Sequence, residues 1–281
     1  MARFLNTFSC GVVVPVRDEA DTLRYTVPAL LQVVQAVRAQ VVWVCNGCTD
    51  DSASIIRGLA GTLGAVLELQ QPSKTGALQA GDEALGDLFP RFYLDADAWL
   101  RVDDLQRLLA ALSIEEIEMV GARNAFDCTK ATALSAAMAR CWLSLPYARE
   151  RCFTGLIGVS RKARSRWTSW PDVLGDDLYA AAMVPSERRL IVSDTLLTSQ
   201  PPADFRGWVR TRQRWAEGER QLLGLGIKIP PRLTQRRALF LRLINPATAI
   251  GAAAFILARL LGSARARRKP ISSWVPERYG S

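Results

Sequence analysis

The sequence predicts an α/β fold, with a mostly parallel central sheet flanked by helices and a basic, partly apolar helical tail at the C-terminus. The first observation is that short apolar runs alternate with segments of helical periodicity through the first hundred residues. Such alternation implies a parallel sheet that is covered on both faces. The second observation is charge: residues 1–205 carry 20 Lys/Arg against 24 Asp/Glu (net −4), whereas residues 206–281 carry 16 against 3 (net +13).

Residues 1–100 are expected to form the regular part of the sheet. Residues 11–16 (GVVVPV) and 41–45 (VVWVC) are continuous apolar runs, as in strands that are buried on both faces. Apolar residues in the segments between the strands recur at helical spacing. The expected strands are 11–16, 41–45, 65–69 and 92–94, and the expected helices are 22–40, 52–63 and 77–88.

The pattern is less regular after residue 100. We expect a strand at 119–124, a helix at 131–145, a strand or tight turn at 153–160, and helices at 175–183 and 206–225. The predicted organisation is one domain over residues 1–225, made of halves 1–100 and 101–225, followed by a tail over residues 226–281.

The composition restricts the possible chemistry. The chain has no histidine, which excludes Ser-His-Asp catalysis and makes a zinc site improbable, so a general base must be Asp, Glu, Lys, Tyr or Cys. The six cysteines do not have the density of a disulfide framework, and they fit a reducing cytoplasm. Cys45 and Cys48 could form a redox pair, but core and loop cysteines are the default interpretation.

The most informative pair of residues is Asp95 and Asp97, which follow the apolar run at 92–94. Two carboxylates at the tip of a strand suit Mg²⁺ or Mn²⁺, which prefers oxygen ligands and is often held jointly with substrate phosphates. The alternative is a solvated turn, because Asp-x-Asp also occurs at strand ends without an ion.

Two other polar clusters also follow predicted strands, at residues 15–19 (PVRDE) and 46–51 (NGCTDD). Ligands of parallel sheets bind outside the carboxyl ends of the strands, so these clusters and Asp95/Asp97 should surround one crevice. Asp176 and Asp177 form a further acidic pair, for which N-terminal helix capping is the structural alternative.

The tail contains a mostly apolar segment, residues 238–261, between arginine-rich flanks. An interfacial helix or hairpin bound to an anionic membrane surface is the favoured interpretation. A helix packed on the catalytic domain and a true membrane span are the alternatives. The flanking basic residues are Arg232, Arg236, Arg237, Arg265, Arg267, Arg268 and Lys269.

Six motifs in this order resemble those of family 2 glycosyltransferases of the GT-A fold, and the resemblance covers roughly residues 9–220. They are residues 12–19 (VVVPVRDE), 45–51 (CNGCTDD), 74–80 (KTGALQA), 95–97 (DAD), 175–178 (GDDL) and 212–215 (RQRW). Each motif is weak alone, and their order and spacing carry the resemblance.

The resemblance implies a role for each matching residue. Asp95 and Asp97 would hold Mn²⁺ or Mg²⁺, Asp177 would be the catalytic base, and Asp176 would orient it. The nucleotide diphosphate sugar would contact Pro15, Arg17, Glu19, Asn46, Lys74, Asp95, Arg212, Arg214 and Trp215.

Three departures from the family pattern stand out. Asn46 occupies a position where Asp is common, which puts the contact to the base in doubt. Thr211 stands where some processive relatives have Gln, which argues against a polymerising synthase. No histidine is available as an additional metal ligand, so the metal would rely on Asp97, the donor diphosphate and water.

The expected function is inverting, metal-dependent transfer of a sugar from a UDP- or GDP-sugar to a hydroxyl acceptor, which could be lipid-linked or a cell-envelope polysaccharide precursor. The expected location is cytoplasmic, at the inner face of the membrane. A nucleotidyltransferase is the alternative, although its usual glycine-rich first loop is absent from residues 15–19. A non-catalytic lipid- or nucleic-acid-binding protein would leave the acidic clusters unexplained, and no nucleic-acid partner is expected.

Overall fold

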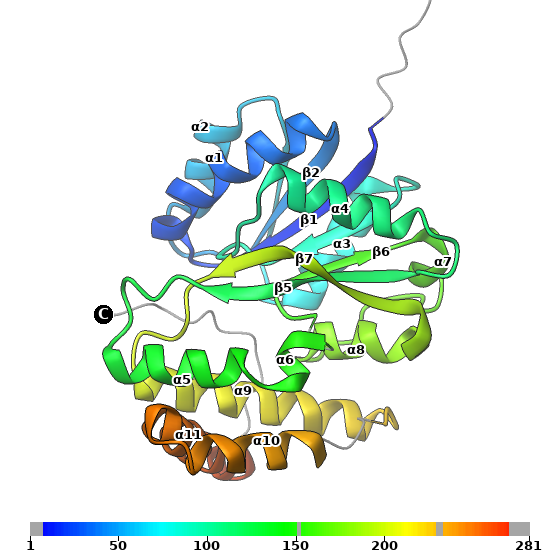
Figure 1. Cartoon of the computed structure of the whole chain (residues 1–281). Helices are drawn as coiled ribbons and strands as arrows, with labels where there is room; N and C mark the ends of the chain where they lie inside the picture. Colours follow the sequence, from blue (N-terminus) through cyan, green and yellow to red (C-terminus); the bar gives the residue numbers. More distant parts are fainter. Residues whose placement is uncertain (1–7, 151–152, 229–232, 270–281) are drawn as a thin grey trace, which may run out of the picture.

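The computed structural model describes residues 8–150, 153–228 and 233–269, with only the backbone described for residue 150 and residues 233–236. Its centre is a seven-stranded sheet in the order β3-β2-β1-β4-β6-β5-β7 (Figure 1). All strands are parallel except β6, which runs antiparallel to β4 and β5. The predicted α/β class is confirmed. The strands are β1 (Cys10–Val16), β2 (Ala39–Asn46), β3 (Ala65–Leu69), β4 (Arg91–Leu94), β5 (Met119–Phe126), β6 (Leu156–Val159) and β7 (Arg189–Ser199).

Helices cover both faces of the sheet. Because successive strand residues point to opposite faces, Val12 and Val14 of β1 join one hydrophobic cluster and Val13 joins the other. The first cluster lies beneath α1 (Ala20–Ala36), α2 (Ser52–Ala60) and α4 (Val102–Leu112). The second lies against α3 (Lys74–Leu85), α7 (Arg161–Arg164) and α8 (Asp176–Met183).

A further helical layer lies beneath the sheet in Figure 1. It contains α5 (Ala133–Leu143), α6 (Pro146–Glu150), α9 (Phe205–Gly224), α10 (Leu233–Leu243) and α11 (Pro246–Arg268), which share a third hydrophobic cluster. The tail therefore forms two helices, and α11 packs on the catalytic domain. A Cβ at Gly251 would lie 2.6 Å from the Ala137 carbonyl oxygen, and one at Gly262 would lie 2.7 Å from Arg212 Cβ.

Two long elements were not predicted, α4 and β7. The sequence of α4 is amphipathic, and Leu105 and Leu108 are its buried face. β7 alternates only in part between buried and exposed residues, and its pairing with β5 shifts register between Ala122 and Arg123. A short 3₁₀ turn, η1 (Ser186–Arg188), precedes β7.

A buried carboxylate ties the two halves of the domain together. Asp82 of α3 accepts hydrogen bonds from Arg91 Nη1 (2.5 Å), Tyr93 Oη (2.7 Å), Arg164 Nε (2.7 Å) and Trp170 Nε1 (2.9 Å). Arg164 and Trp170 lie in the second half of the domain, so this network fixes the position of that half against residues 1–100.

Candidate active site

One cavity opens beside the carboxyl ends of β1 and β4, as the topology of a parallel sheet predicts. Elements from both halves of the domain and from the tail line it. Ten of the twelve residues predicted from the sequence are among the lining residues: Pro15, Glu19, Lys74, Asp95, Asp97, Asp176, Asp177, Arg212, Arg214 and Trp215.

The acidic residues that line one wall of this cavity lie in the segments that follow β1 and β4. The backbone N–H of Asp95 donates to the Gly155 carbonyl oxygen (2.9 Å), and the Asp95 carbonyl accepts from Ala98 N–H (3.1 Å), which fixes the turn that carries Asp97. Burial, with Asp97 and then Asp95 nearby, raises the pKa of Glu19 from an ordinary value of 4.5 to about 8. Negative charge is therefore concentrated where a divalent cation would be bound.

Lys74 links this wall to the acidic pair of α8. Its Nζ lies 2.8 Å from Asp95 Oδ1 and 3.1 Å from Asp176 Oδ2. Burial would lower the pKa of Lys74, but Asp176 and Asp95 outweigh it and raise the pKa above its ordinary value. Burial, opposed by Lys74 and reinforced by Asp177 and Asp95, raises the pKa of Asp176 to about 6.

The carboxylate of Asp177 has different partners from that of Asp176. Its Oδ2 accepts a hydrogen bond from Thr154 Oγ1 (3.0 Å), and its Oδ1 accepts from the backbone N–H of Leu178 (2.8 Å). The N-cap position of α8 is Gly175, so neither aspartate is the N-cap residue of this helix. A Cβ at Gly218 of α9 would lie 3.0 Å from Gly175 N, which shows how closely α9 supports the start of α8.

The basic wall consists of helices α9 and α11. The guanidinium carbon of Arg212 lies 4.7 Å from the ring centre of Trp215 and 5.3 Å from that of Phe255. These aromatic contacts hold a largely buried cation at the cavity. Arg214 and, from α11, Arg259 also line the cavity.

Two predicted residues lie outside the lining, Arg17 and Asn46. Asn46 is fully buried, and its Nδ2 donates to the Val16 carbonyl oxygen (2.8 Å), which joins the ends of β1 and β2. An aspartate there could not donate this hydrogen bond, which gives Asn46 a structural reason to differ from the family pattern.

Thr154, Phe255 and Arg259 are among the lining residues that the sequence analysis did not single out. Thr154 follows a segment with no distinctive pattern. Phe255 and Arg259 lie in the apolar tail segment, where their helical spacing is the only signal that they face the same side.

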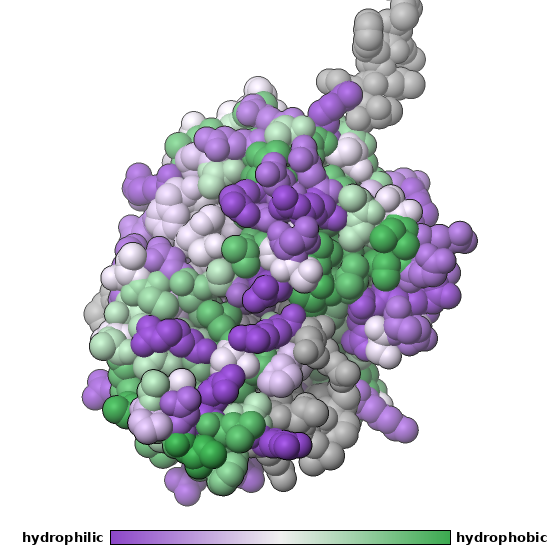
Figure 2. All heavy atoms as spheres, in the orientation of Figure 1, coloured by the Kyte–Doolittle hydropathy of each residue, from purple (hydrophilic) through white to green (hydrophobic). Residues whose placement is uncertain are grey.

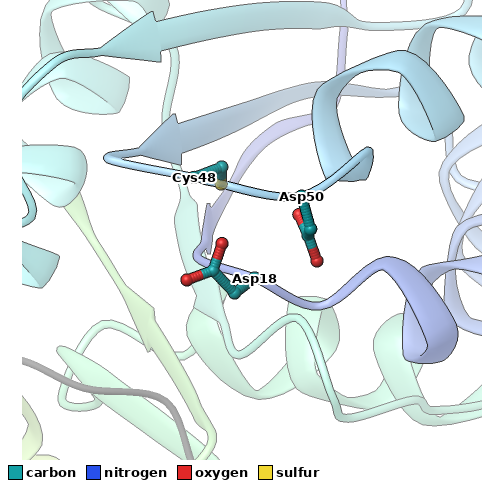
Figure 3. Close-up of side chains that lie close together, drawn as sticks. All are labelled: Asp18, Cys48 and Asp50. Carbon is teal, nitrogen blue, oxygen red and sulfur yellow. The ribbon is translucent and has the colours of Figure 1, made fainter.

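The loops after β1 and β2 bring Asp18, Cys48 and Asp50 together (Figure 3), with potential ligand atoms within 4.8 Å of one another. Both carboxylates are already engaged with the backbone. Asp18 Oδ1 accepts from Thr49 N–H (2.6 Å), and Asp50 accepts from the N–H groups of Ser52 (3.0 Å) and Ala20 (3.1 Å). These bonds make the group a support of the two loops.

The sequence predicts cysteines in the core and in loops and no disulfide framework, and five of the six cysteines lie among the described residues. Cys10, Cys45, Cys48, Cys128 and Cys141 are free thiols, and Cys45 lies in the core. Cys152 and Arg232 are outside the described residues, and so is the side chain of Arg236.

Comparison of the sequence with protein-family models and with curated proteins found no match. Among solved structures, the chain is similar to the mannosyltransferase PcManGT from Pyrobaculum calidifontis in complex with GDP-Man and Mn²⁺ (TM-score 0.60, 24% identity, covering 94% of this chain and 83% of that one). It is also similar to S. aureus TarS 1-349 in complex with UDP-GlcNAc (TM-score 0.51, 12% identity, 93% and 92% covered). A third similar structure is GalNAc-T7 with UDP, GalNAc and Mn²⁺ (TM-score 0.51, 13% identity, 70% and 44% covered).

These likenesses extend over nearly the whole chain for the first two structures, although the sequence identities are low. The chain therefore has the GT-A fold of nucleotide-sugar glycosyltransferases.

Proposed function

We propose that this protein is an inverting, metal-dependent glycosyltransferase that moves a sugar from a UDP- or GDP-sugar to a hydroxyl acceptor. The observation that carries the proposal is the meeting of an acidic wall and a basic wall in one cavity at the strand ends. The solved structures of the same fold bind GDP-Man with Mn²⁺ and UDP-GlcNAc, which supports this class of donor.

The metal site is assigned to Asp95 and Asp97. Burial first, and then the nearby Asp97 and Asp95, raise the pKa of Glu19, and a divalent cation would relieve the repulsion among these carboxylates. Only oxygen ligands are available from these residues, which suits Mn²⁺ or Mg²⁺. When bound, the ion would neutralise charge on the diphosphate leaving group.

The chain's own cations would share that task. Arg212 and Arg214 of α9 and Arg259 of α11 line the same cavity as the carboxylates, and a guanidinium group can donate two hydrogen bonds to one phosphate group. The stacking of Arg212 on Trp215 and Phe255 fixes its orientation before the donor binds.

Asp177 is assigned as the base that takes the acceptor hydroxyl proton. Both aspartates line the cavity, but Asp176 is committed to the ion pair with Lys74, whereas the Asp177 carboxylate is oriented by a hydrogen bond from Thr154. Attack of the activated hydroxyl on the face opposite the leaving diphosphate would invert the anomeric carbon. Asp176 and Lys74 would position Asp95 and the start of α8.

The membrane part of the proposal rests on α10 and α11. α11 is long and apolar enough to cross a membrane by length and composition, although part of it is buried in the protein. Its exposed apolar side chains, with those of α10, form what we term the tail face: Phe240, Leu241, Leu243, Ile244, Ile250, Leu257, Leu260 and Leu261.

This face is visible as hydrophobic surface over α10 in Figure 2, and Arg265, Arg267 and Arg268 end α11. An apolar helix with basic flanks suits the interface of an anionic membrane, at the cytoplasmic side. A lipid-linked acceptor would then approach the cavity across α11. Flotation with anionic vesicles tests this part, and a full chain that stays in the soluble fraction would contradict it.

The enzyme itself is tested by release of nucleoside diphosphate across a panel of UDP- and GDP-sugars, with Mn²⁺, Mg²⁺ or chelator. We expect metal-dependent turnover of one donor, lost in Asp97→Asn and retained in Asp103→Asn, an exposed carboxylate of α4. Proton NMR of the glycosylated product should show an anomeric configuration opposite to that of the donor. Full metal-dependent turnover by Asp97→Asn would contradict the metal assignment.

A further inference from the structure

A second groove lies on the other side of α5 and α6 from the catalytic cavity. It has a volume of about 420 Å³ and lies between the end of β5 and these helices. Arg123, Asn124, Arg140, Ser144 and Arg149 supply its polar lining. Figure 2 shows hydrophilic side chains over the boundary between β5 and the helical layer.

The charge of this groove is not balanced by the described residues around it. Arg123 Nη1 donates to the Ser193 carbonyl oxygen (3.4 Å), and Arg149 Nε donates to the Leu143 carbonyl oxygen (3.3 Å). In the described part of the chain, neither these two arginines nor Arg140 lies within ion-pair distance of a carboxylate.

Other basic clusters of the protein are built differently. Buried Glu118 is surrounded by Lys162, Arg166 and Arg188 at 3.0, 2.5 and 3.2 Å, so its cations have an internal counter-charge. The groove arginines have no such partner among the described residues. The groove therefore offers donors and positive charge together.

A fourth arginine connects the groove to the tail face. Arg242 of α10 donates from Nε to Ser144 Oγ (3.0 Å), and Ser144 lines the groove. Phe240, Leu241 and Ile244, on the same helix or just after it, are exposed. A polar, cationic groove thus borders an apolar surface.

We propose that this groove binds a phosphate group. The planar N–H forks of arginine match phosphate oxygens, and three arginines line this groove. The neighbouring tail face favours the phosphate of an anionic lipid head group over free phosphate, and only this choice of source depends on the membrane orientation proposed above. Bound there, the lipid would hold α5 and α6, and with them one wall of the catalytic cavity, at the membrane surface.

The test compares Arg140→Glu with Arg24→Glu, a matched charge reversal at an exposed arginine of α1, in the full chain. Co-sedimentation with phosphatidylcholine vesicles, with and without phosphatidylglycerol, measures lipid binding. Calorimetric titration with inorganic phosphate, in chelator, measures binding of the free anion. Neither readout uses catalysis, so failure here and failure of the transferase proposal are distinguishable.

We expect Arg140→Glu to weaken binding to the anionic vesicles about tenfold or more, since the reversal changes the local charge by two units and each unit near such a surface contributes about 1 kcal/mol. Arg24→Glu should stay within about twofold of wild type. Loss of phosphate binding in Arg140→Glu with unchanged vesicle binding would support the site and assign it to a soluble phosphate. Equal effects of the two reversals, or no effect of Arg140→Glu on either ligand, would overturn the proposal.

Discussion

The two walls of the catalytic cavity come from regions of opposite charge and different construction. The acidic wall belongs to residues 1–205 (net −4), and hydrogen bonds at the ends of strands hold it in place. The basic wall belongs to residues 206–281 (net +13), and side-chain packing between α9 and α11 holds it in place. The proposed transfer from a nucleotide diphosphate sugar would use both walls, and the packing of α11 on the domain brings Phe255 and Arg259 to the cavity.

The largest effect is expected at the acidic wall. Asp177→Asn removes the proton acceptor and keeps the shape, so kcat should fall by about 10²–10⁴-fold while donor binding changes little. Steady-state kinetics and donor titration measure the two quantities. Asp172→Asn, an exposed carboxylate before α8, is the control. A larger loss in Asp176→Asn than in Asp177→Asn would reverse the roles assigned to the pair.

The basic wall is tested by Arg259→Gln, which removes one cation facing the diphosphate. We expect a loss of up to about 10²-fold in turnover, because one oriented donor to developing charge is typically worth this much or more. Arg265→Gln, on the same helix and exposed, should leave turnover with a soluble acceptor near wild type. Equal turnover of both variants would remove α11 from the catalytic machinery.

The contrast between the walls also explains what the sequence could predict. Asp95, Asp97 and Glu19 follow apolar strands directly, and the carboxyl ends of parallel strands meet at one edge, so local pattern was enough to bring them together. Arg259 and Phe255 depend on how α11 is rotated against α9. An apolar helix has the same composition whether it packs on protein or enters a membrane, so the sequence left these alternatives open.

The direction and pairing of the strands could not be predicted from the sequence, for a similar reason. Nothing in the LIGV run of β6 indicates that it runs antiparallel to its neighbours, because direction depends on the intervening chain. The ion pair between Lys74 and Asp176 was also hidden, since it joins residues about a hundred positions apart. The predicted division at residue 225 stays a prediction, and α11 shares a hydrophobic cluster with α5 and α9.

The attachment of the basic wall can be weakened without touching a charged group. Gly262→Ala places a methyl group 2.7 Å from Arg212 Cβ and 2.8 Å from backbone atoms of α9. Overpacking of this kind typically costs about 1–3 kcal/mol of unfolding free energy. Urea unfolding measures the loss, and turnover should fall with it because Arg212 is displaced.

The control for that change is Gly58→Ala in α2, where a Cβ meets nothing within 4 Å. This variant should be unchanged or more stable by up to about 1 kcal/mol, from the better helix propensity of alanine. Equal stability of Gly262→Ala and wild type would show that the tail helix does not depend on this close approach.

The smallest effect concerns the charge of the acidic wall itself. Burial and the neighbouring Asp97 and Asp95 raise the pKa of Glu19 to about 8, against 4.5 ordinarily. Between these values the folded protein keeps a proton that the unfolded chain releases, so the free energy of unfolding must fall as pH rises.

Relative to Glu19→Gln, which cannot titrate, the free energy of unfolding of the wild type should fall by roughly 1 kcal/mol per pH unit between about pH 5 and 8. Urea unfolding in the presence of chelator measures this slope. Parallel pH curves for wild type and Glu19→Gln would contradict the charge cluster. Saturating Mn²⁺ should abolish the slope over the upper part of this range, because a cation at Asp95 and Asp97 favours the ionised carboxylate. The same measurement therefore reports on the metal site without relying on turnover.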